Sequence, residues 1–231
     1  MRPEFPKIYF IRHGETDWNL QRLVQSTEDN DLNATGIAQA QAIAQALHDL
    51  EPELRNFSFY SSPQKRAQHT TQIICADQPR DFTTVKTDPR LRELEFGTWE
   101  GKPIDDMHHS AGYPKNGIEH YHWQPEGGES YAQGVARVDA FLRSIPGPVL
   151  IVSHGAIARC MKVMFAIYRV LTFNSWPRRK AAIACWKTAN ISGLTPTTSR
   201  INKTTCPTTP SATSSALQPS AKATGQQSAP W

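Results

Sequence analysis

Residues 8–19 read IYFIRHGETDWN, and this stretch decides the fold. The apolar run 8–11 is typical of a buried β-strand, and Arg12-His13-Gly14 follows where that strand must turn. Open α/β sheets place ligand chemistry at the carboxyl ends of their strands. Glycine allows the backbone to turn sharply there and to come close to a bound group. We therefore expect Arg12 and His13 to belong to a phosphoryl-binding site.

A second stretch ends in the same way. Residues 147–155 read GPVLIVSHG, which predicts another buried strand that stops at His154-Gly155. The carboxyl ends of neighbouring parallel strands lie close together. We therefore expect His13 and His154 to meet at one edge of the sheet.

The chain as far as residue 165 alternates between strand and helix patterns. A further strand is expected at 57–63, followed by a third strand within 83–93. Apolar residues at helical spacing predict helices at about 35–50, 64–76, 130–144 and 156–165. Asn33 or Thr35 is expected to cap the first helix, and Ser130 with Gln133 forms a plausible capping box. This alternation is typical of a parallel sheet with helices on both faces, an α/β fold.

Five side chains at strand ends or in the following turns suit phosphoryl transfer: Arg12, His13, Arg66, Glu93 and His154. A neutral His13 would attack phosphorus and form a phosphohistidine that water then hydrolyses. Arg12 and Arg66 would bind the non-bridging oxygens, because guanidinium forks match phosphate geometry. A protonated His154 would add a donor. Glu93 would protonate the leaving oxygen and then help to activate water.

Smaller contributions to phosphate binding are expected from two further positions. Asn19 would donate to the phosphate or fix the His13 ring. Free backbone N–H groups after Gly14 and Gly155 would bind anions at helix starts. Because cationic side chains neutralise the phosphate, no metal or other cofactor is required.

Six segments, in order, resemble the histidine phosphatase superfamily, also called the phosphoglycerate mutase-like family. They are RHGETDWN (12–19), LNATGIAQAQ (32–41), YSSPQKRAQHT (60–70), LRELEFGTWEG (91–101), PEGGES (125–130) and VLIVSHGAIAR (149–159). The resemblance implies a three-layer αβα sandwich with a mostly parallel sheet, over a domain at residues 5–194. It aligns the five residues above with the family's catalytic set and makes Glu93, not Glu95, the proton donor.

This chain departs from the family pattern at three positions. The family usually has Gln-Gly where this chain has Gln25-Ser26, so Ser26 adds a side chain near the expected phosphate site. Asp31 stands where proline is frequent, and Ala156 replaces a frequent second glycine.

The reaction expected from the resemblance is hydrolysis of a small phosphorylated metabolite through phosphohistidine. A phosphoglycerate mutase is the alternative within the same fold, although the insertion at 101–128 is short for a cofactor-dependent mutase. A catalytically inactive, C-terminally damaged member is the other alternative. The residues that would select the substrate lie in 101–128, which we expect to be loop-rich and to cover the carboxyl edge of the sheet.

Several of these side chains also admit structural explanations. Asn19 suits a turn or a helix cap equally well. Glu95 and Glu100 compete with Glu93 as the acid. The four insertion histidines, namely His108, His109, His120 and His122, suit a substrate-facing or solvated surface better than a metal site, and Trp99 and Trp123 suit packing.

The C-terminal part of the sequence has an unusual composition. Residues 166–231 carry eight Lys/Arg and no Asp/Glu, and 20 of the last 37 residues are Ser, Thr or Pro. Such a stretch buries too little apolar surface to offset the entropy lost on ordering. We expect either a disordered tail at 195–231 or a shifted reading frame that begins near 165–169 and makes 166–194 atypical. In the shifted frame, 179–194 permits a hairpin-like sequence with an Asn-Gly turn.

Charge and composition restrict the partners. The net charge of +4 divides into −4 for residues 1–165 (17 Lys/Arg against 21 Asp/Glu) and +8 for the rest, so it does not describe a basic nucleic-acid-binding face. No apolar run approaches the ~20 residues that a membrane helix needs, and no leader pattern precedes the first strand. The four cysteines lack metal-site or disulfide spacing. We expect a cytoplasmic monomer or homodimer that binds a small phosphomonoester, without nucleic acid or membrane.

Overall fold

The computed structural model describes residues 5–167 and 183–186. The expected domain boundary at 194, the tail at 195–231 and most of the atypical segment at 166–194 lie outside the described residues. The disordered tail and the shifted reading frame therefore stay predictions.

A five-stranded sheet in the order β3-β2-β4-β1-β5 forms the middle layer. Its strands are β1 (Ile8–Arg12), β2 (Ser58–Ser61), β3 (Lys86–Thr87), β4 (Val149–Ser153) and β5 (Ile183–Trp186). β1, β4, β2 and β3 run parallel, and β5 pairs antiparallel with β1. The mostly parallel sheet predicted from the sequence is confirmed. β2 and β3 are shorter than expected, and β3 is a two-residue pairing.

The two central strands consist almost entirely of buried apolar residues. All of β4 is buried, as are the first four residues of β1. A parallel strand covered on both faces has this continuous apolar pattern rather than an alternating one. In register, Ile11 lies opposite Val152 and Arg12 opposite Ser153. The next residues, His13 and His154, are thereby brought to the same edge.

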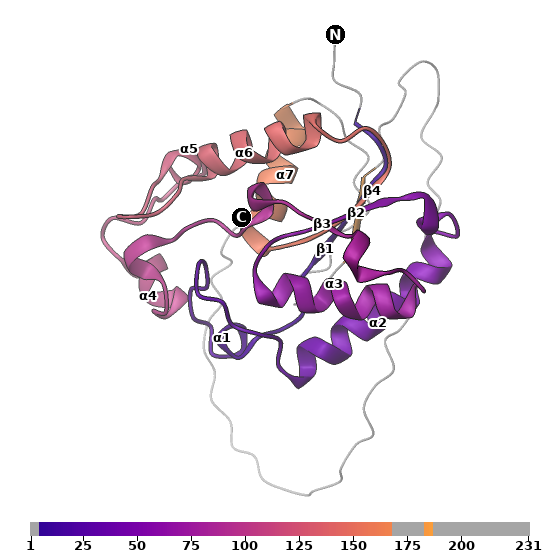
Figure 1. Ribbon diagram of the computed structural model, residues 1–231. Helices are drawn as coiled ribbons and strands as arrows, with labels where there is room; N and C mark the ends of the chain where they lie inside the picture. Colours follow the sequence, from indigo (N-terminus) through magenta and orange to yellow (C-terminus); the bar gives the residue numbers. More distant parts are fainter. Residues whose placement is uncertain (1–4, 168–182, 187–231) are drawn as a thin grey trace, which may run out of the picture. The chain divides into compact units, whose positions relative to one another are not determined.

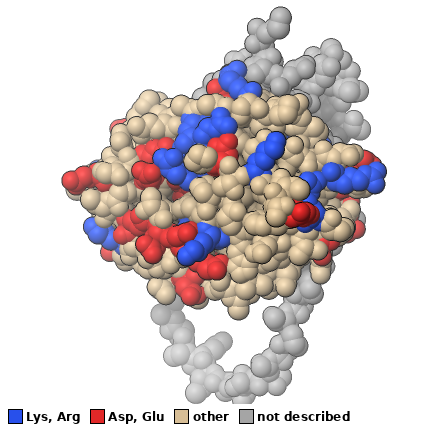
Figure 2. Space-filling model, in the orientation of Figure 1, with Lys and Arg blue, Asp and Glu red and all other residues tan. Residues whose placement is uncertain are grey.

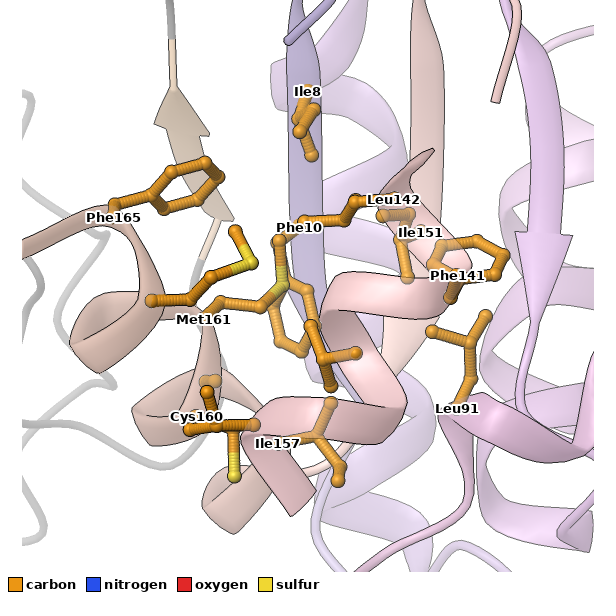
Figure 3. Close-up of a cluster of buried hydrophobic side chains, with 14 of the residues drawn as sticks. Ile8, Phe10, Leu91, Phe141, Leu142, Ile151, Ile157, Cys160, Met161 and Phe165 are labelled. Carbon is orange, nitrogen blue, oxygen red and sulfur yellow. The ribbon is translucent and has the colours of Figure 1, made fainter. Parts of the chain in front are cut away.

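Helices cover both faces of the sheet (Figure 1). On one face α2 (Ala34–Leu50) packs beside α3 (Lys65–Asp77), and on the other α6 (Tyr131–Arg143) packs beside α7 (Gly155–Ile167). Figure 3 shows the second layer, where Phe10 and Ile151 of the sheet meet Phe141 of α6 and Met161 of α7. The predicted three-layer sandwich is therefore observed.

Helix starts follow the predicted capping residues. Asn33, not Thr35, caps α2, and its side chain accepts a hydrogen bond from the Gly36 N–H at 2.9 Å. Ser130 and Gln133 form the expected capping box of α6. Shorter elements are α1 (Asp17–Leu20), α4 (Ile104–His109), α5 (Gly117–His122) and the 3-10 turns Leu54–Asn56, Phe82–Thr84, Pro89–Leu91 and Gly97–Trp99.

The insertion at 101–128 contains more regular structure than the sequence indicates. It holds both α4 and α5, which the sequence did not predict, although most of the loop-rich insertion is still irregular. Each helix has six residues, too few to show a helical period. The side chain of Asn116 caps α5, and α4 buries Met107.

Charges of both signs are interspersed on the face shown in Figure 2. Among the described helices, none is both long and apolar enough to cross a membrane.

Candidate active site

His13 and His154 lie side by side at the carboxyl edge of the sheet. The His13 N–H donates to the Ser153 carbonyl at 2.9 Å, which continues the β1–β4 ladder to His13. The two ring centroids are 5.1 Å apart, at an interplanar angle of 57°. Both side chains are buried. The predicted meeting of the two histidines is therefore observed.

Hydrogen bonding fixes the tautomer of His13. Its Nδ1 lies 2.7 Å from the Gly14 carbonyl oxygen. A carbonyl can only accept, so Nδ1 must carry the proton. In the neutral ring, Nε2 then holds the free electron pair.

His154 has the opposite tautomer. Arg66 Nε donates to His154 Nδ1 at 3.3 Å, and a guanidinium can only donate. Nε2 therefore carries the proton and donates to Ser62 Oγ at 2.7 Å. Ser62 directly follows β2 and His154 directly follows β4, so the ends of two neighbouring strands and the start of α3 contribute to one hydrogen-bonded group.

Both imidazoles are held in the neutral form. Burial, followed by the nearby Arg66 guanidinium, lowers the pKa of His13 and of His154 well below the usual histidine value. Neutrality suits His13 as a nucleophile. It also means that His154 is not protonated in this state, and an arriving phosphate dianion would raise its pKa again.

Arg66 lies fully buried at the start of α3. Besides His154, it donates to the carbonyl oxygens of Ser26 and Glu28, at 3.0 Å each. Burial lowers the pKa of Arg66 to about 10, so it stays charged near neutral pH. Since three of its five N–H groups are engaged, two remain for another acceptor.

Two polar atoms near this group lack partners. Within the described residues, Arg12 Nε and Ser26 Oγ are buried without a hydrogen-bond partner. Such groups are rare in native structures and call for an explanation. A phosphoryl group, which has several acceptor oxygens, would satisfy the guanidinium donor and the hydroxyl together. In that arrangement Ser26, where the family usually has glycine, would add a donor as well as bulk.

Glu93 reaches the same edge from the loop after the 3-10 turn at 89–91. Its carboxylate accepts from the backbone N–H groups of Ala156 (3.2 Å) and Ile157 (3.3 Å) in the first turn of α7. Glu95 instead pairs with Arg92. The proton-donor role of Glu93 stays a prediction, although its position next to the histidine-bearing strand end suits that role.

Glu100, the third candidate acid, has a structural contact. It accepts from the N–H groups of Ser26 (3.0 Å) and Glu28 (2.6 Å) and from the Thr27 hydroxyl. Glu100 thus binds amide N–H groups of the segment 26–28, and Arg66 binds carbonyl oxygens of the same segment.

The expectation of free backbone N–H groups after the two glycines was wrong. The N–H groups of Gly14, Glu15 and Thr16 donate to the side chains of Thr70, Gln39 and Asn19, respectively. Those after Gly155 bind Glu93. Side chains already occupy both positions, which leaves the arginines, His154 and Ser26 as the candidate phosphate ligands.

Gly14 is needed for helix packing. A Cβ at Gly14 would overlap the Gly36 carbonyl oxygen, and one at Gly36 would overlap the backbone of Glu15. The turn after β1 therefore presses directly against the first turn of α2. A Cβ at Gly155 would lie 3.5 Å from Arg12 Nε, which is an ordinary contact.

Asn19 serves as the capping partner of Thr16 at α1. Its amide nitrogen also donates to the Gln25 side chain at 3.3 Å. The cap that the sequence allowed is therefore present, whereas contact with phosphate stays a prediction.

Sequence reasoning missed two supporting residues, Ser62 and Arg137. Ser62 lies within a segment that carries the family resemblance, but its type alone does not indicate a histidine partner. Arg137 of α6 donates to the carbonyl oxygens of Arg90 (2.7 Å) and Arg92 (2.8 Å) and pairs with Glu129. A carbonyl partner has no sequence signal, so this support for the Glu93 loop was not predictable.

The insertion histidines are separated. His108 and His120 join an aromatic cluster with Tyr113. His108, His109 and His122 are exposed, and His120 is half-buried. In the described part of the chain, no three His, Cys, Asp or Glu side chains are grouped so that they could hold a metal ion. Metal independence stays a prediction.

Comparison with known proteins gives a consistent result. The model of the histidine phosphatase superfamily (branch 1) matches residues 8–204. The chain is 33% identical over 150 residues to "Uncharacterized phosphatase PhoE" of Bacillus subtilis, covering 64% of this chain and 72% of that protein. It is 33% identical over 165 residues to "Probable phosphoglycerate mutase GpmB" of Proteus mirabilis, covering 67% and 72%.

Solved structures with the same fold include both kinds of enzyme. A phosphoglycerate mutase from Thermus thermophilus has a TM-score of 0.56 at 28% identity, over 67% of this chain and 81% of that one. A mycobacterial glucosyl-3-phosphoglycerate phosphatase has a TM-score of 0.55 at 28% identity, over 68% and 78%. The chain belongs to the histidine phosphatase superfamily, branch 1.

Proposed function

We propose that the protein is a phosphomonoester hydrolase that acts through a phosphohistidine at His13. The observation that carries this proposal is the pairing of a neutral His13, whose free electron pair is on Nε2, with the cations of half-buried Arg12 and fully buried Arg66. Histidine phosphatases and mutases share this chemistry, so membership of the family supports it.

In the first step the Nε2 electron pair of His13 forms a bond to phosphorus. The bond from phosphorus to the ester oxygen breaks, and the leaving oxygen takes the proton of the Glu93 carboxyl group. Arg12, Arg66 and His154 face the charge that spreads over the non-bridging oxygens. The products are an alcohol and phosphohistidine.

In the second step water gives its proton to the Glu93 carboxylate and attacks phosphorus. The N–P bond breaks, and inorganic phosphate leaves. His13 regains its electron pair and Glu93 its proton, so the cycle closes without a further reactant. Cationic side chains neutralise the phosphate throughout, which makes a metal ion unnecessary in this scheme.

A mutase remains the second candidate, because relatives of both kinds match. It would return the phosphoryl group to another hydroxyl of the same molecule rather than to water. We favour hydrolysis because the insertion at 101–128, with its two short helices, is small.

The test is hydrolysis of p-nitrophenyl phosphate between pH 5 and 8, followed by acid-labile phosphate on His13 in a quenched reaction. We expect turnover by the natural sequence, loss of at least about 1,000-fold in His13→Ala, and little change in His109→Ala, an exposed histidine of α4. Turnover that survives in His13→Ala contradicts the mechanism.

Two further readouts separate the alternatives. Interconversion of phosphoglycerates without phosphate release would favour the mutase. Absence of turnover by soluble, folded protein would favour the inactive alternative.

A further inference from the structure

Gln64 stands between β2 and α3, in the turn that also carries Ser62 and leads to Arg66. It is the N-cap residue of α3, where short polar side chains that bind the first N–H groups of the helix are preferred. Gln64 is half-buried, and its side chain makes no such capping bond. Departures from local preference of this kind are expected at functional sites.

The Gln64 amide joins two segments that are far apart in the sequence. Its Oε1 accepts a hydrogen bond from the Glu93 backbone N–H at 2.9 Å. Its Nε2 donates to the Ser26 carbonyl oxygen, which also accepts from Arg66 at 3.0 Å. A backbone N–H only donates and a carbonyl only accepts, so the amide has a single orientation, and a flip would break both bonds.

Glu93 is thereby held at two points. Gln64 binds its backbone N–H. Its carboxylate accepts from the backbone N–H groups of Leu94 (3.1 Å), Ala156 (3.2 Å) and Ile157 (3.3 Å). Residues 93–96 belong to no helix or strand. Side chains must therefore supply the hydrogen bonds that fix the backbone here, since regular structure does not.

The position of this backbone matters for the chemistry proposed above. Proton transfer from Glu93 requires the leaving oxygen to lie within about 2.6–3.2 Å of the carboxyl oxygen. A displacement of about 1 Å can lower the rate about 100-fold. Ser26 is a candidate phosphate ligand, so the Gln64 amide fixes the acid relative to the segment expected to border the phosphate.

We propose that Gln64 is a positioning residue for the proton-donor step, because its amide ties the backbone of Glu93 to the carbonyl of Ser26. This proposal rests on the proposed function, since it concerns the placement of the acid in that mechanism. Gln64 acts through Glu93 and contacts no reacting atom. Only esters whose alcohol needs a proton in order to leave should therefore depend on Gln64.

The experiment compares phenyl phosphate with p-nitrophenyl phosphate. The two esters are similar in shape, but p-nitrophenolate leaves readily without a proton, whereas phenolate is a much poorer leaving group. The value of kcat/KM covers the steps up to release of the alcohol, in which Glu93 acts as the acid. Gln64→Met should lower kcat/KM about 10- to 100-fold for phenyl phosphate and less than about 3-fold for p-nitrophenyl phosphate.

Gln78→Met is the matched control. Gln78 is the C-cap residue at the other end of α3, and its Nε2 donates to the Ala44 carbonyl oxygen at 2.8 Å. The control therefore loses an amide contact of the same kind without touching Glu93, and the ratio of kcat/KM for the two esters should not change. Gln64→Ala, which removes the same amide group, replaces Gln64→Met if the latter does not fold.

A second measurement separates positioning from a general structural role. Glu93→Gln keeps the shape of the side chain but cannot serve as the acid, so it should change the ratio between the two esters by about 100-fold. In this background Gln64→Met should leave the ratio within about 3-fold, because no acid remains to be positioned. A structural role of Gln64 would have the same effect in both backgrounds.

Failure of this inference is distinct from failure of the proposed function. An unchanged ratio in Gln64→Met, or a change that persists in full in Glu93→Gln, overturns the positioning role while p-nitrophenyl phosphate is still hydrolysed through His13. Unfolding of both Gln64 variants overturns it as well, because the role is then structural. If the natural protein hydrolyses no phosphoester and forms no phosphohistidine, both proposals are overturned.

Discussion

Arg66 donates from Nε to His154 Nδ1 at 3.3 Å, which joins the start of α3 to the end of β4. The same guanidinium reaches the carbonyl oxygens of Ser26 and Glu28. One side chain therefore sets the tautomer of His154 and anchors the segment 26–28. Its planar, branched shape is essential to this double function.

Arg66→Lys should consequently be severe although the charge is kept. A single ammonium cannot reach all three acceptors and also present two parallel N–H groups to phosphate. We expect kcat/KM for p-nitrophenyl phosphate to fall by at least about 100-fold, because hydrogen bonds to charged groups contribute about 1.5–3 kcal/mol each. Arg55→Lys, at an exposed ion pair, is the matched control. A change of less than 3-fold in Arg66→Lys would show that its charge alone matters.

The two neutral histidines should make stability depend on pH. In the folded protein their pKa values lie well below the unfolded value of about 6.5. Below that pH the unfolded chain binds protons that the folded protein does not, so the free energy of unfolding falls as the pH falls. The slope approaches about 1.4 kcal/mol per pH unit for each histidine.

Urea unfolding at pH 7.5, 6.5 and 5.5 measures this slope. Replacing His13 or His154 by Gln should reduce it, whereas replacing the exposed His122 by Gln should not. Identical slopes in all four proteins would contradict the assignment of neutral, buried rings.

Gly36→Ala should lower the free energy of unfolding, which is the opposite of the usual effect of this substitution in a helix. Alanine in place of glycine within a helix ordinarily stabilises by about 1 kcal/mol. Here the new Cβ would lie 2.7 Å from the Glu15 nitrogen and would overlap the Glu15 carbonyl. We expect a loss of about 1–3 kcal/mol in the free energy of unfolding, together with reduced activity, because the displaced turn carries His13.

Gly112→Ala supplies the control for this prediction, since a Cβ there meets no atom within 4 Å. Thermal unfolding of both variants gives the comparison. A stabilised Gly36→Ala protein would mean that the β1 turn and α2 separate without cost.

Arg137→Ala should destabilise the protein and impair the Glu93 loop. The change leaves the Glu129 carboxylate, which is 13% exposed, without its bidentate partner, and it frees two carbonyl oxygens of the loop. Breaking a largely buried ion pair costs about 3–5 kcal/mol. Arg143→Ala, in a surface pair, should cost under about 1 kcal/mol. Similar midpoints in urea for both variants would refute this role of Arg137.

The sequence predicted the elements that have strong, local signals. β1 and β4 were recognisable because strands buried on both faces read as continuous apolar runs, and the cap of α6 was recognisable because Ser130 and Gln133 are three residues apart. α4 and α5 were not, since six residues are too few for a period. The proximity of His13 and His154 could be predicted from strand topology alone, because both residues follow neighbouring parallel strands.

The wrong or missing predictions mainly concern which side chains form hydrogen bonds with backbone N–H and carbonyl groups. The N–H groups of Ala156 and Ile157 looked available for phosphate because they begin a helix. Glu93 occupies them, and nothing in the local sequence of α7 reveals a carboxylate that arrives from a loop more than 60 residues earlier. Arg137 escaped notice for the same reason.

The order of strands in the sheet has a consequence for folding. β1 emerges first from the ribosome, yet its neighbours are β4 and β5, which are the last described strands to be made. Pairings of such high sequence separation form slowly. The strand that leads to His13 therefore stays unpaired until more than 140 further residues have been synthesised. A nascent chain arrested before β4 should lack phosphatase activity, and activity should appear only when β4 clears the exit tunnel.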